Sequence, residues 1–149
     1  MAINVLIVDD SPTVCAMLSQ IMGNAGFNVV GIGKSAEEGL ELAAKLKPDV
    51  ITLDIEMPGK SGLQALPLMQ KACDAAIIMC STLTNQAAQA TLQSLEKGAF
   101  DYIPKTEIGK SFTPDMLKER VTNAYAYVTQ KRKGESNYKP SVPIASLPH

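Results

Sequence analysis

Short apolar runs alternate along this chain with longer segments in which apolar residues recur with helical periodicity. The runs are rich in valine and isoleucine, and such nearly continuous apolar stretches are typical of strands buried on both faces of a sheet. They occupy residues 3–8, 29–32, 50–53, 76–80 and 100–103. Strands that alternate with helices at this spacing predict a parallel sheet with helices on both faces.

Right-handed crossovers between these runs favour a doubly wound α/β fold. We expect five parallel strands in the flavodoxin-like order 2-1-3-4-5. In such a fold the binding crevice lies beyond the carboxyl ends of the strands, near the point where the winding reverses. Polar residues that directly follow a run are therefore the first candidates for a functional site.

The predicted helices carry recognisable start signals. In the first, five apolar residues fall on one face: Val14, Met17, Leu18, Ile21 and Met22. Ser11 precedes this helix as a predicted N-cap, and Ser35 with Glu38 predicts a capping box for the second helix. The third helix, roughly residues 63–71, contains Pro67, so we expect it to be short or bent.

The chain is expected to hold one domain, at residues 1–130, because its length fits one ordinary domain. From Lys131 onward the sequence has no apolar periodicity, and its last part contains Pro140, Pro143 and Pro148. We therefore expect residues 131–149 to form a flexible C-terminal tail or linker. The residues by themselves leave open whether the chain is a whole protein or a part of one.

The charge balance argues against several classes of partner. With 14 lysine and arginine residues against 15 aspartate and glutamate residues, the chain offers no basic surface for nucleic acid. It has no apolar run near the ~18 residues that a membrane helix needs, and its N-terminus lacks the basic segment of a secretory signal. We expect a soluble cytoplasmic protein with no nucleic-acid or membrane partner.

The histidine and cysteine content excludes some common chemistries. The single histidine, His149, is the last residue, so a catalytic pair built on a positioned imidazole is not expected. Cys15, Cys73 and Cys80 are far apart and form no CxxC pair, which argues against a zinc site. We expect these cysteines to behave as small apolar residues. Any chemistry must then come from carboxylates, hydroxyls and lysines.

Polar residues follow four of the five runs directly or closely. They are Asp9 and Asp10 after the first run, Asp54 after the third, Ser81 after the fourth and Lys105 after the fifth. Taken singly, each has an ordinary explanation as a helix-terminal charge, a turn or cap residue, or a surface lysine. Because parallel strands lie about 4.8 Å apart, however, the three aspartates are expected to converge.

Three converging carboxylates raise one another's pKa unless a cation lies among them. Oxygen ligands without histidine or cysteine suit a hard ion, and Mg²⁺ is the default. A site that combines such a metal with the Lys105 ammonium and the Ser81 hydroxyl suits a phosphoryl group. The nucleophile would be a carboxylate, because the other candidates lack an activating base. Asp54 is central and is the best candidate.

These residues and their flanks resemble a response-regulator receiver domain over roughly residues 3–130. The motifs that carry the resemblance are Asp9-Asp10, LDIEMPG at 53–59, Ser81-Thr82 and GAFDYIPK at 98–105. Within the family, residues 55–58 and 80–84 are most similar to the receiver half of the chemotaxis methylesterases. The resemblance implies the CheY-like fold with the strand order given above.

The resemblance also implies roles for the acidic residues. Asp54 would accept a phosphoryl group from the phosphohistidine of a sensor histidine kinase. Mg²⁺ would be held by Asp9 or Asp10, by Asp54 and by the backbone carbonyl of Glu56. Lys105 would pair with one oxygen of the phosphoryl group.

A conformational switch is the further implication of the resemblance. Ser81 would hydrogen-bond a phosphoryl oxygen, and Tyr102 would turn inward as Ser81 moves toward the phosphate. As an ordinary residue, Tyr102 would be a half-buried strand aromatic, and both interpretations stay open. Phosphorylation adds about -1.5 to -2 charge. It would change the affinity of the face formed by the fourth helix, fifth strand and fifth helix for an unidentified downstream protein, in chemotaxis if the closest resemblance holds.

The chain also departs from the family pattern. The family usually has a proline after the lysine of the fifth strand, joined by a cis bond, whereas Thr106 follows Lys105 here. The bond is therefore either trans, with a differently shaped loop, or a costly cis bond. The chain contains no GxSxG stretch, so we expect no methylesterase domain and no enzyme beyond self-catalysed phosphoryl transfer and autodephosphorylation.

Other functions remain open on the residues alone. The chain could be a degenerate receiver, marked by Thr106, that acts as a phosphorylation-independent docking module. It could be the isolated regulatory domain of a chemoreceptor methylesterase. A haloacid-dehalogenase-like phosphatase would need a D-x-D pattern, whereas Asp9 and Asp10 are adjacent. A flavodoxin-like cofactor site would need a hydroxyl- and glycine-rich loop in place of these aspartates.

Overall fold

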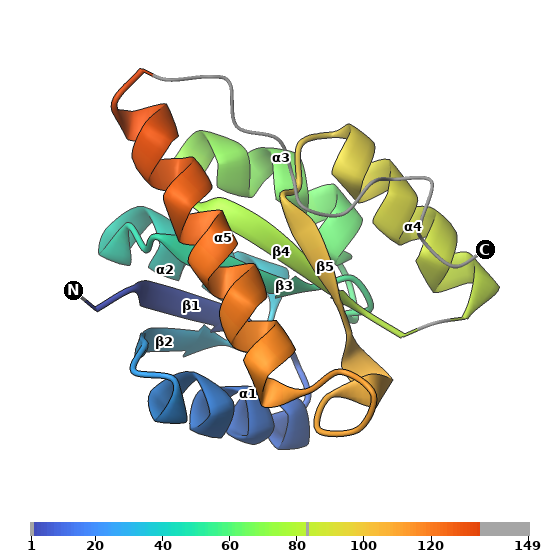
Figure 1. Cartoon of the computed structure of the whole chain (residues 1–149). Coiled ribbons are helices and arrows are strands. Elements are labelled where there is room, and N and C mark those ends of the chain that lie inside the picture. Colours follow the sequence, from blue (N-terminus) through green and yellow to red (C-terminus); the bar gives the residue numbers. More distant parts are fainter. Residues whose placement is uncertain (1, 83, 135–149) are drawn as a thin grey trace.

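Five parallel strands form the centre of the molecule (Figure 1). The computed structural model describes residues 2–82 and 84–134. The strands are β1 (Asn4–Val8), β2 (Asn28–Gly33), β3 (Val50–Asp54), β4 (Ala76–Ser81) and β5 (Asp101–Pro104). They pair in parallel in the order β2-β1-β3-β4-β5, which confirms the predicted sheet.

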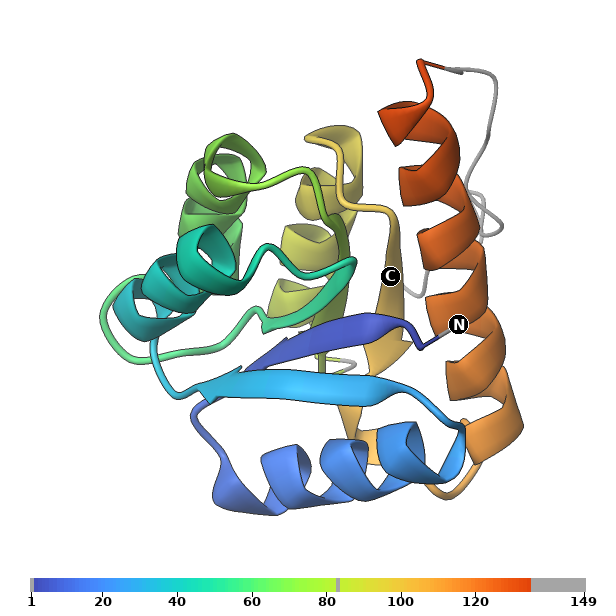
Figure 2. The ribbon, with the colours of Figure 1, turned by 90° about the vertical axis from the view of Figure 1, so that its left-hand side faces the viewer.

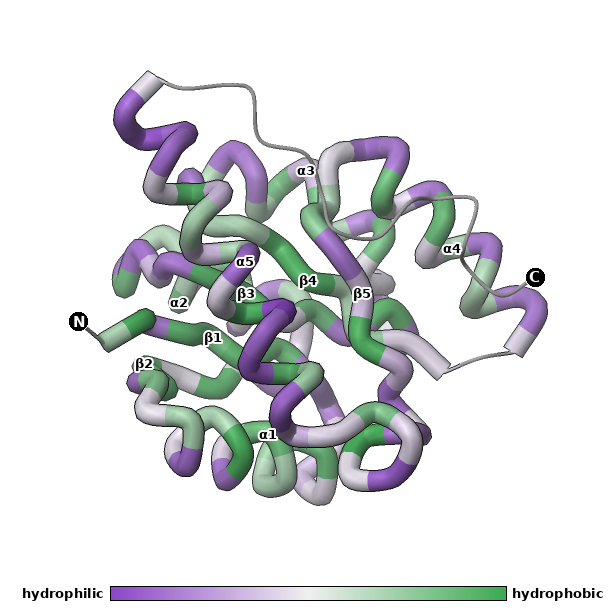
Figure 3. The backbone as a smooth tube through the Cα atoms, in the orientation of Figure 1, coloured by the Kyte–Doolittle hydropathy of each residue, from purple (hydrophilic) through white to green (hydrophobic). Residues whose placement is uncertain are grey.

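Alternate residues of the strands face two separate cores. Val5 and Ile7 of β1 face one core, whereas Leu6 and Val8 face the other. Every residue of β3 and β4 is buried, and these strands colour mainly green in the hydropathy view (Figure 3). Burial on both faces explains why the sequence runs are nearly continuously apolar rather than alternating.

The five helices divide between the two faces of the sheet. One face is covered by α1 (Pro12–Asn24) and α5 (Pro114–Arg132), and the other by α2 (Ala36–Leu46), α3 (Gly62–Ala72) and α4 (Asn85–Glu96). The edge-on view separates α2 and α3 from α5 across the sheet (Figure 2). A 3-10 turn, η1 (Lys105–Glu107), follows β5 directly.

The helix starts agree with the predicted caps, with one correction. The Ser11 hydroxyl accepts a hydrogen bond from Val14 N, and the Ser35 hydroxyl accepts one from Glu38 N. The Glu38 carboxylate, however, accepts from the Lys34 amide rather than from the amide of Ser35. Glu38 therefore stabilises the residue before the cap, and the reciprocal half of the predicted capping box is absent.

Helix α3 continues without a break through Pro67, from Gly62 to Ala72. A complete capping box starts it, because Ser61 and Gln64 exchange side-chain to backbone hydrogen bonds. Leu66 and Met69 are fully buried on its inner face. Proline removes one hydrogen bond from the helix, but the cap and the buried face hold its length, so Pro67 does not shorten the helix.

Helix α5 includes Lys131 and Arg132, which lie beyond the predicted domain boundary at residue 130. Residues 135–149 of the expected tail lie outside the described part of the chain, so the tail stays a prediction. Among the described residues, no helix is both long enough and apolar enough to cross a membrane.

Candidate functional site

The candidate site lies where the chain leaves the carboxyl ends of the central strands. Parallel register places Leu53 beside Val8, Cys80 beside Asp54, and Pro104 beside Ser81. The residues that follow these strands therefore meet at one edge of the sheet, as the doubly wound fold predicts.

Asp9, Asp10 and Asp54 converge at this edge. Each offers a carboxylate oxygen, and these oxygens lie within 4.8 Å of one another. Asp54 and Asp9 are buried, with 0% and 1% exposure, whereas Asp10 is exposed. The predicted convergence of the three aspartates is thus confirmed, and it combines two desolvated carboxylates with one that solvent can reach.

Lys105 extends into the acidic cluster from the end of β5. Its Nζ lies 3.0 Å from Asp54 Oδ2 and 3.2 Å from Asp9 Oδ2. The described residues contain no cis peptide bond, so the Lys105–Thr106 bond is trans. The replacement of proline by Thr106 therefore leaves the lysine in contact with both buried carboxylates.

Burial and charge shift the ionisation of this cluster. Burial, with the neighbouring charge of Asp9, raises the pKa of Asp54 to about 7, and Lys105 opposes this shift. Burial alone would lower the pKa of Lys105, but its contacts with Asp54 and Asp9 outweigh that effect and raise it. The lysine is therefore a permanent cation, whereas the central carboxylate is costly to ionise in the metal-free protein.

The oxygen atoms of the cluster suit a hard cation. Asp9 Oδ1 accepts a hydrogen bond from Ser11 N at 2.9 Å, and Asp54 Oδ1 accepts one from Glu56 N at 3.1 Å. Among the described residues, Asp9 Oδ2 and Asp54 Oδ2 are buried without a hydrogen-bond partner of good geometry, although the Lys105 ammonium lies near both. An all-oxygen set with unsatisfied buried lone pairs fits Mg²⁺. The backbone carbonyl of Glu56 as a ligand stays a prediction.

Helix α3 begins in direct contact with the strand that carries Asp54. A Cβ atom on Gly62 would lie 2.2 Å from the Asp54 carbonyl oxygen and 2.9 Å from Ile55 Cα. Only glycine allows this approach, which the Gly62 N to Ile55 O hydrogen bond of 3.0 Å maintains. Sequence reasoning missed this residue. Its signal was a glycine at the first helical position after the Ser61 cap.

Ser81 is buried, but its hydroxyl donates to backbone carbonyls, with Thr82 O nearest, rather than to Asp54. Ser81 Oγ lies 2.7 Å from Thr82 O and 3.4 Å from Ala87 O in the first turn of α4. Among the described residues, no hydrogen bond joins Ser81 to Asp54. The structure thus brings Ser81 to the edge of the site without placing its hydroxyl on the carboxylate.

The loops after β3 and β4 are tied together by a contact that sequence reasoning did not foresee. Glu56 Oε1 accepts hydrogen bonds from Thr82 Oγ1 at 2.6 Å and from Thr82 N at 3.4 Å. Glu56 therefore has two contacts at the site: its carboxylate accepts from Thr82, and its backbone amide donates to Asp54. No local sequence pattern predicts this pair, since its members are 26 positions apart.

Tyr102 is half-buried on β5 and packs against the core on the α4 side. This position agrees with the interpretation of Tyr102 as a half-buried strand aromatic and leaves its role as a switch to be proposed. The Arg120 guanidinium of α5 lies over its ring, with Cζ 5.3 Å from the ring centroid.

Two of the three cysteines adjoin the acidic cluster, because Cys15 Sγ donates a hydrogen bond to the Asp9 carbonyl at 3.3 Å and Cys80 pairs with Asp54 in the sheet. Cys15 and Cys80 are buried and Cys73 is half-buried, and all three are free thiols. Burial raises the pKa of each thiol and so suppresses the reactive thiolate. This agrees with their predicted role as small apolar residues. His149 lies outside the described residues.

A cavity of about 340 Å³ opens beside the site, between the loop after β3 and α4. Ile55, Met57, Leu63, Ala87 and Ala90 contribute apolar side chains to it. The remaining lining residues, Glu56, Ser61, Thr84 and Gln86, include no cation that could bind an anionic phosphoryl group. The carboxylate and lysine cluster, rather than this cavity, is therefore the chemical centre of the site.

Comparisons with known proteins agree with this geometry. The sequence model of the family described as "Response regulator receiver domain" matches residues 5–122. The response regulator domain of CheB from Thermotoga maritima has a similar structure, with a TM-score of 0.73 and 37% sequence identity. That match covers 85% of this chain and 98% of the Thermotoga chain.

Two similar proteins bear the name protein-glutamate methylesterase/protein-glutamine glutaminase. The protein of the group 1 operon of Pseudomonas putida is 34% identical over 147 residues, which cover 98% of this chain and 40% of the relative. The protein numbered 2 under this name in Vibrio vulnificus is 44% identical over 117 residues, which cover 78% of this chain and 33% of the relative. This chain therefore spans only about a third to two fifths of the length of these relatives.

Proposed function

Because this chain belongs to the family of response regulator receiver domains, we propose that Asp54 accepts a phosphoryl group from the phosphohistidine of a sensor histidine kinase. The observation that carries the proposal is a fully buried carboxylate with two further aspartates around it and a lysine 3.0 Å away. This arrangement positions a nucleophile and a permanent cation for an incoming phosphoryl group.

The transfer exchanges one bond to phosphorus for another. An Asp54 carboxylate oxygen forms a bond to phosphorus while the bond from phosphorus to the donor imidazole nitrogen breaks, and that nitrogen takes up a proton. Asp9, Asp10, Asp54 and the Glu56 carbonyl would hold Mg²⁺. The metal, when bound, supplies positive charge for the phosphoryl oxygens.

Lys105 changes partners during this reaction. In the resting protein its ammonium offsets the charges of Asp54 and Asp9 at 3.0 and 3.2 Å. Once Asp54 carries the phosphoryl group, the same ammonium is within reach of a phosphoryl oxygen. The position of Lys105 beside Asp54 favours an active receiver over a degenerate docking module, in spite of Thr106.

The response to phosphorylation would pass through Ser81 and Tyr102. The added charge of about -1.5 to -2 attracts the Ser81 hydroxyl, which in the resting protein donates to Thr82 O at 2.7 Å and lies 3.4 Å from Ala87 O of α4. Movement of Ser81 would release its contact with the first turn of α4 and let Tyr102 reorient. The face made by α4, β5 and α5 would then change its affinity for a downstream protein.

The relatives support a place in chemotaxis. Two methylesterases and a CheB response regulator domain are 34% to 44% identical to this chain over the aligned parts. A second candidate function is therefore the regulatory domain of a chemoreceptor methylesterase. The phosphatase and flavin-binding alternatives lose their support, since the receiver family model covers residues 5–122.

Intact-mass measurement after incubation with Mg²⁺ and acetyl phosphate tests the proposal. We expect one phosphoryl adduct on the wild type and none on Asp54→Asn. Asp115→Asn, which changes an exposed carboxylate of α5 in the same way, is the matched control and should be labelled like the wild type. A folded wild type that is labelled by neither acetyl phosphate nor phosphoramidate would contradict the proposal.

A further inference from the structure

Arg120 of α5 lies at the edge of the sheet that β5 forms. Strand β5 is the last strand of the sheet and lies between α4 and α5 (Figure 1). Arg120 Nη1 lies 3.2 Å from Asp101 Oδ1 and donates a hydrogen bond to the Tyr102 carbonyl. Asp101 is fully buried, and the Arg120 side chain is 17% exposed. The guanidinium is thus fixed by an ion pair and a backbone hydrogen bond.

Two aromatic rings enclose the same guanidinium. Arg120 Cζ lies 5.3 Å from the centroid of the Tyr102 ring and 5.1 Å from that of the Phe112 ring. Tyr102 packs with the core on the α4 side of the sheet, whereas Phe112 belongs to the core under α1 and α5. Both distances are within the range of a cation–π contact. Arg120 therefore links side chains from the two faces of the sheet at its edge.

We propose that Arg120 is a positioning residue that holds the Tyr102 ring in its resting orientation, so that phosphorylation of Asp54 turns Tyr102 only by breaking this contact. The inference rests on the proposed function, because it requires an Asp54 that takes up a phosphoryl group. Phe112 and Asp101 keep the Arg120 guanidinium in place, so the guanidinium does not follow the Tyr102 ring when that ring turns. The contact acts as a restraint on the resting state.

Linkage gives the expected effect on the active site. A contact made only in the resting state lowers the affinity for any ligand that favours the reoriented state, and removing the contact raises that affinity by the same factor. Cation–π contacts contribute enough to change such an equilibrium from about two-fold, where exposed, to about thirty-fold, where desolvated. We expect an increase within this range in the affinity for a phosphoryl mimic at Asp54.

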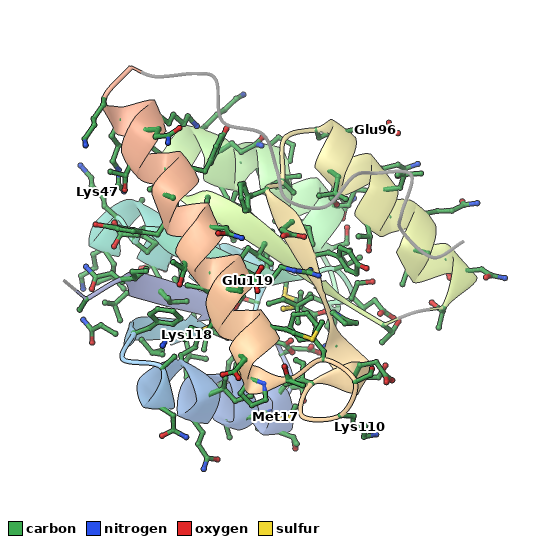
Figure 4. All side chains as sticks on the ribbon, in the orientation of Figure 1. Met17, Lys47, Glu96, Lys110, Lys118 and Glu119 are labelled. Atoms are coloured by element: carbon green, nitrogen blue, oxygen red, sulfur yellow. The ribbon has the colours of Figure 1, made fainter. Side chains whose placement is uncertain are left out.

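The test must distinguish the proposed restraint on Tyr102 from a purely structural role of Arg120. Removing Arg120 alone would break its ion pair with the buried Asp101, which lowers the stability of the fold. Arg120→Gln is therefore compared with and without Tyr102→Leu while Asp101, which the proposed restraint requires, stays intact. Urea unfolding checks that each variant is folded. The labelled Lys118 is an exposed cation on the same helix (Figure 4), and Lys118→Gln is the matched control.

The probe is beryllium fluoride with Mg²⁺, which adds to a carboxylate as a phosphoryl mimic, and its affinity is measured by titration. The chain has four tyrosines and no tryptophan, so 3-fluorotyrosine labelling gives few ¹⁹F resonances. Tyr102→Leu identifies the resonance of Tyr102 by its loss. The position of this resonance responds to the orientation of the ring and also to the loss of the nearby cation. Only a movement along the change that beryllium fluoride causes in the wild type is therefore counted as reorientation.

We expect Arg120→Gln to raise the affinity for beryllium fluoride severalfold and to move the Tyr102 resonance of the free protein toward its bound position. In the Tyr102→Leu protein the same substitution should leave the affinity unchanged. An equal change with and without Tyr102, or no change in either, overturns the proposal. A Tyr102 resonance that beryllium fluoride does not move overturns it as well. If the folded wild type does not bind beryllium fluoride at all, the proposed function itself fails.

Discussion

Replacing Asp54 by asparagine should stabilise the metal-free protein, although it removes the proposed nucleophile. The Asp54 carboxylate is fully buried, and burial together with the charge of Asp9 raises its pKa from 3.8 to about 7. The folded protein therefore binds this proton more tightly than the unfolded chain does. Ionisation of Asp54 costs stability in the folded state, and an amide of nearly the same shape avoids this cost.

The size and the pH dependence of the gain follow from linkage. Between the two pKa values the folded state holds the proton and the unfolded state does not, so the stability of the wild type falls as pH rises through this window. A shift of about three pKa units corresponds to about 4 kcal/mol once both states are ionised, and only about 1 kcal/mol of this cost is present at about pH 4.5. The gain from Asp54→Asn should be largest at about pH 8 and small in acid.

Urea unfolding followed by far-UV circular dichroism, with EDTA present to remove metal ions, measures the free energy of unfolding at both pH values. Glu119→Gln is the control, since Glu119 is an exposed carboxylate on α5 (Figure 4) and its substitution should change stability by less than about 0.5 kcal/mol. A gain for Asp54→Asn that is the same at both pH values, or a loss at about pH 8, would refute the electrostatic argument.

Three further outcomes are expected. Mg²⁺ at ten times its dissociation constant should stabilise the wild type by about 1.4 kcal/mol in thermal or urea unfolding, and Asp54→Asn by much less. A wild type whose stability does not change with Mg²⁺ would refute the metal site. Gly62→Ala should lower the free energy of unfolding in urea by about 1–3 kcal/mol and slow labelling by acetyl phosphate, because the added Cβ would press on the Asp54 carbonyl. The control Gly23→Ala has open space around its Cβ and should stabilise the protein by up to about 1 kcal/mol, so equal effects of the two substitutions would contradict this prediction. Arg132→Gln should lower the free energy of unfolding by about 1 kcal/mol at neutral pH, a value discounted for the exposure of Arg132 and Asp74. Because Arg132 lowers the pKa of Asp74, this loss of stability should shrink as the pH falls below about 4, and a loss that does not depend on pH would exclude the ion pair as its source.

The order and type of the strands and helices were predictable because the burial of each element determines the pattern of apolar residues along its own segment of the sequence. Strands buried on both faces need continuous apolar runs, and helices packed on one face need apolar residues at helical spacing. Element ends were less predictable. Pro67 suggested a short or bent α3, but a complete capping box and two buried side chains hold the helix to Ala72.

The charged centre of the site was also predictable. Asp9, Asp10, Asp54 and Lys105 follow strands that lie in parallel, and parallel strands bring their carboxyl ends to the same edge of a sheet. Once the strand order is known, no further information is needed to place these four residues together. Sequence reasoning left open only whether Thr106 would displace the lysine, and the trans bond leaves it in contact with Asp54.

By itself, the sequence determined the alternation of strands and helices and the residues that the sheet carries to its functional edge. Only the tertiary structure decided that the Ser81 hydroxyl lies away from Asp54, that Glu56 accepts hydrogen bonds from Thr82, and that the Tyr102 and Phe112 rings enclose the Arg120 guanidinium. The physical reason is that periodicity and burial act through neighbours along the chain, whereas these contacts join side chains that only the packing of separate elements brings into hydrogen-bond or ring distance.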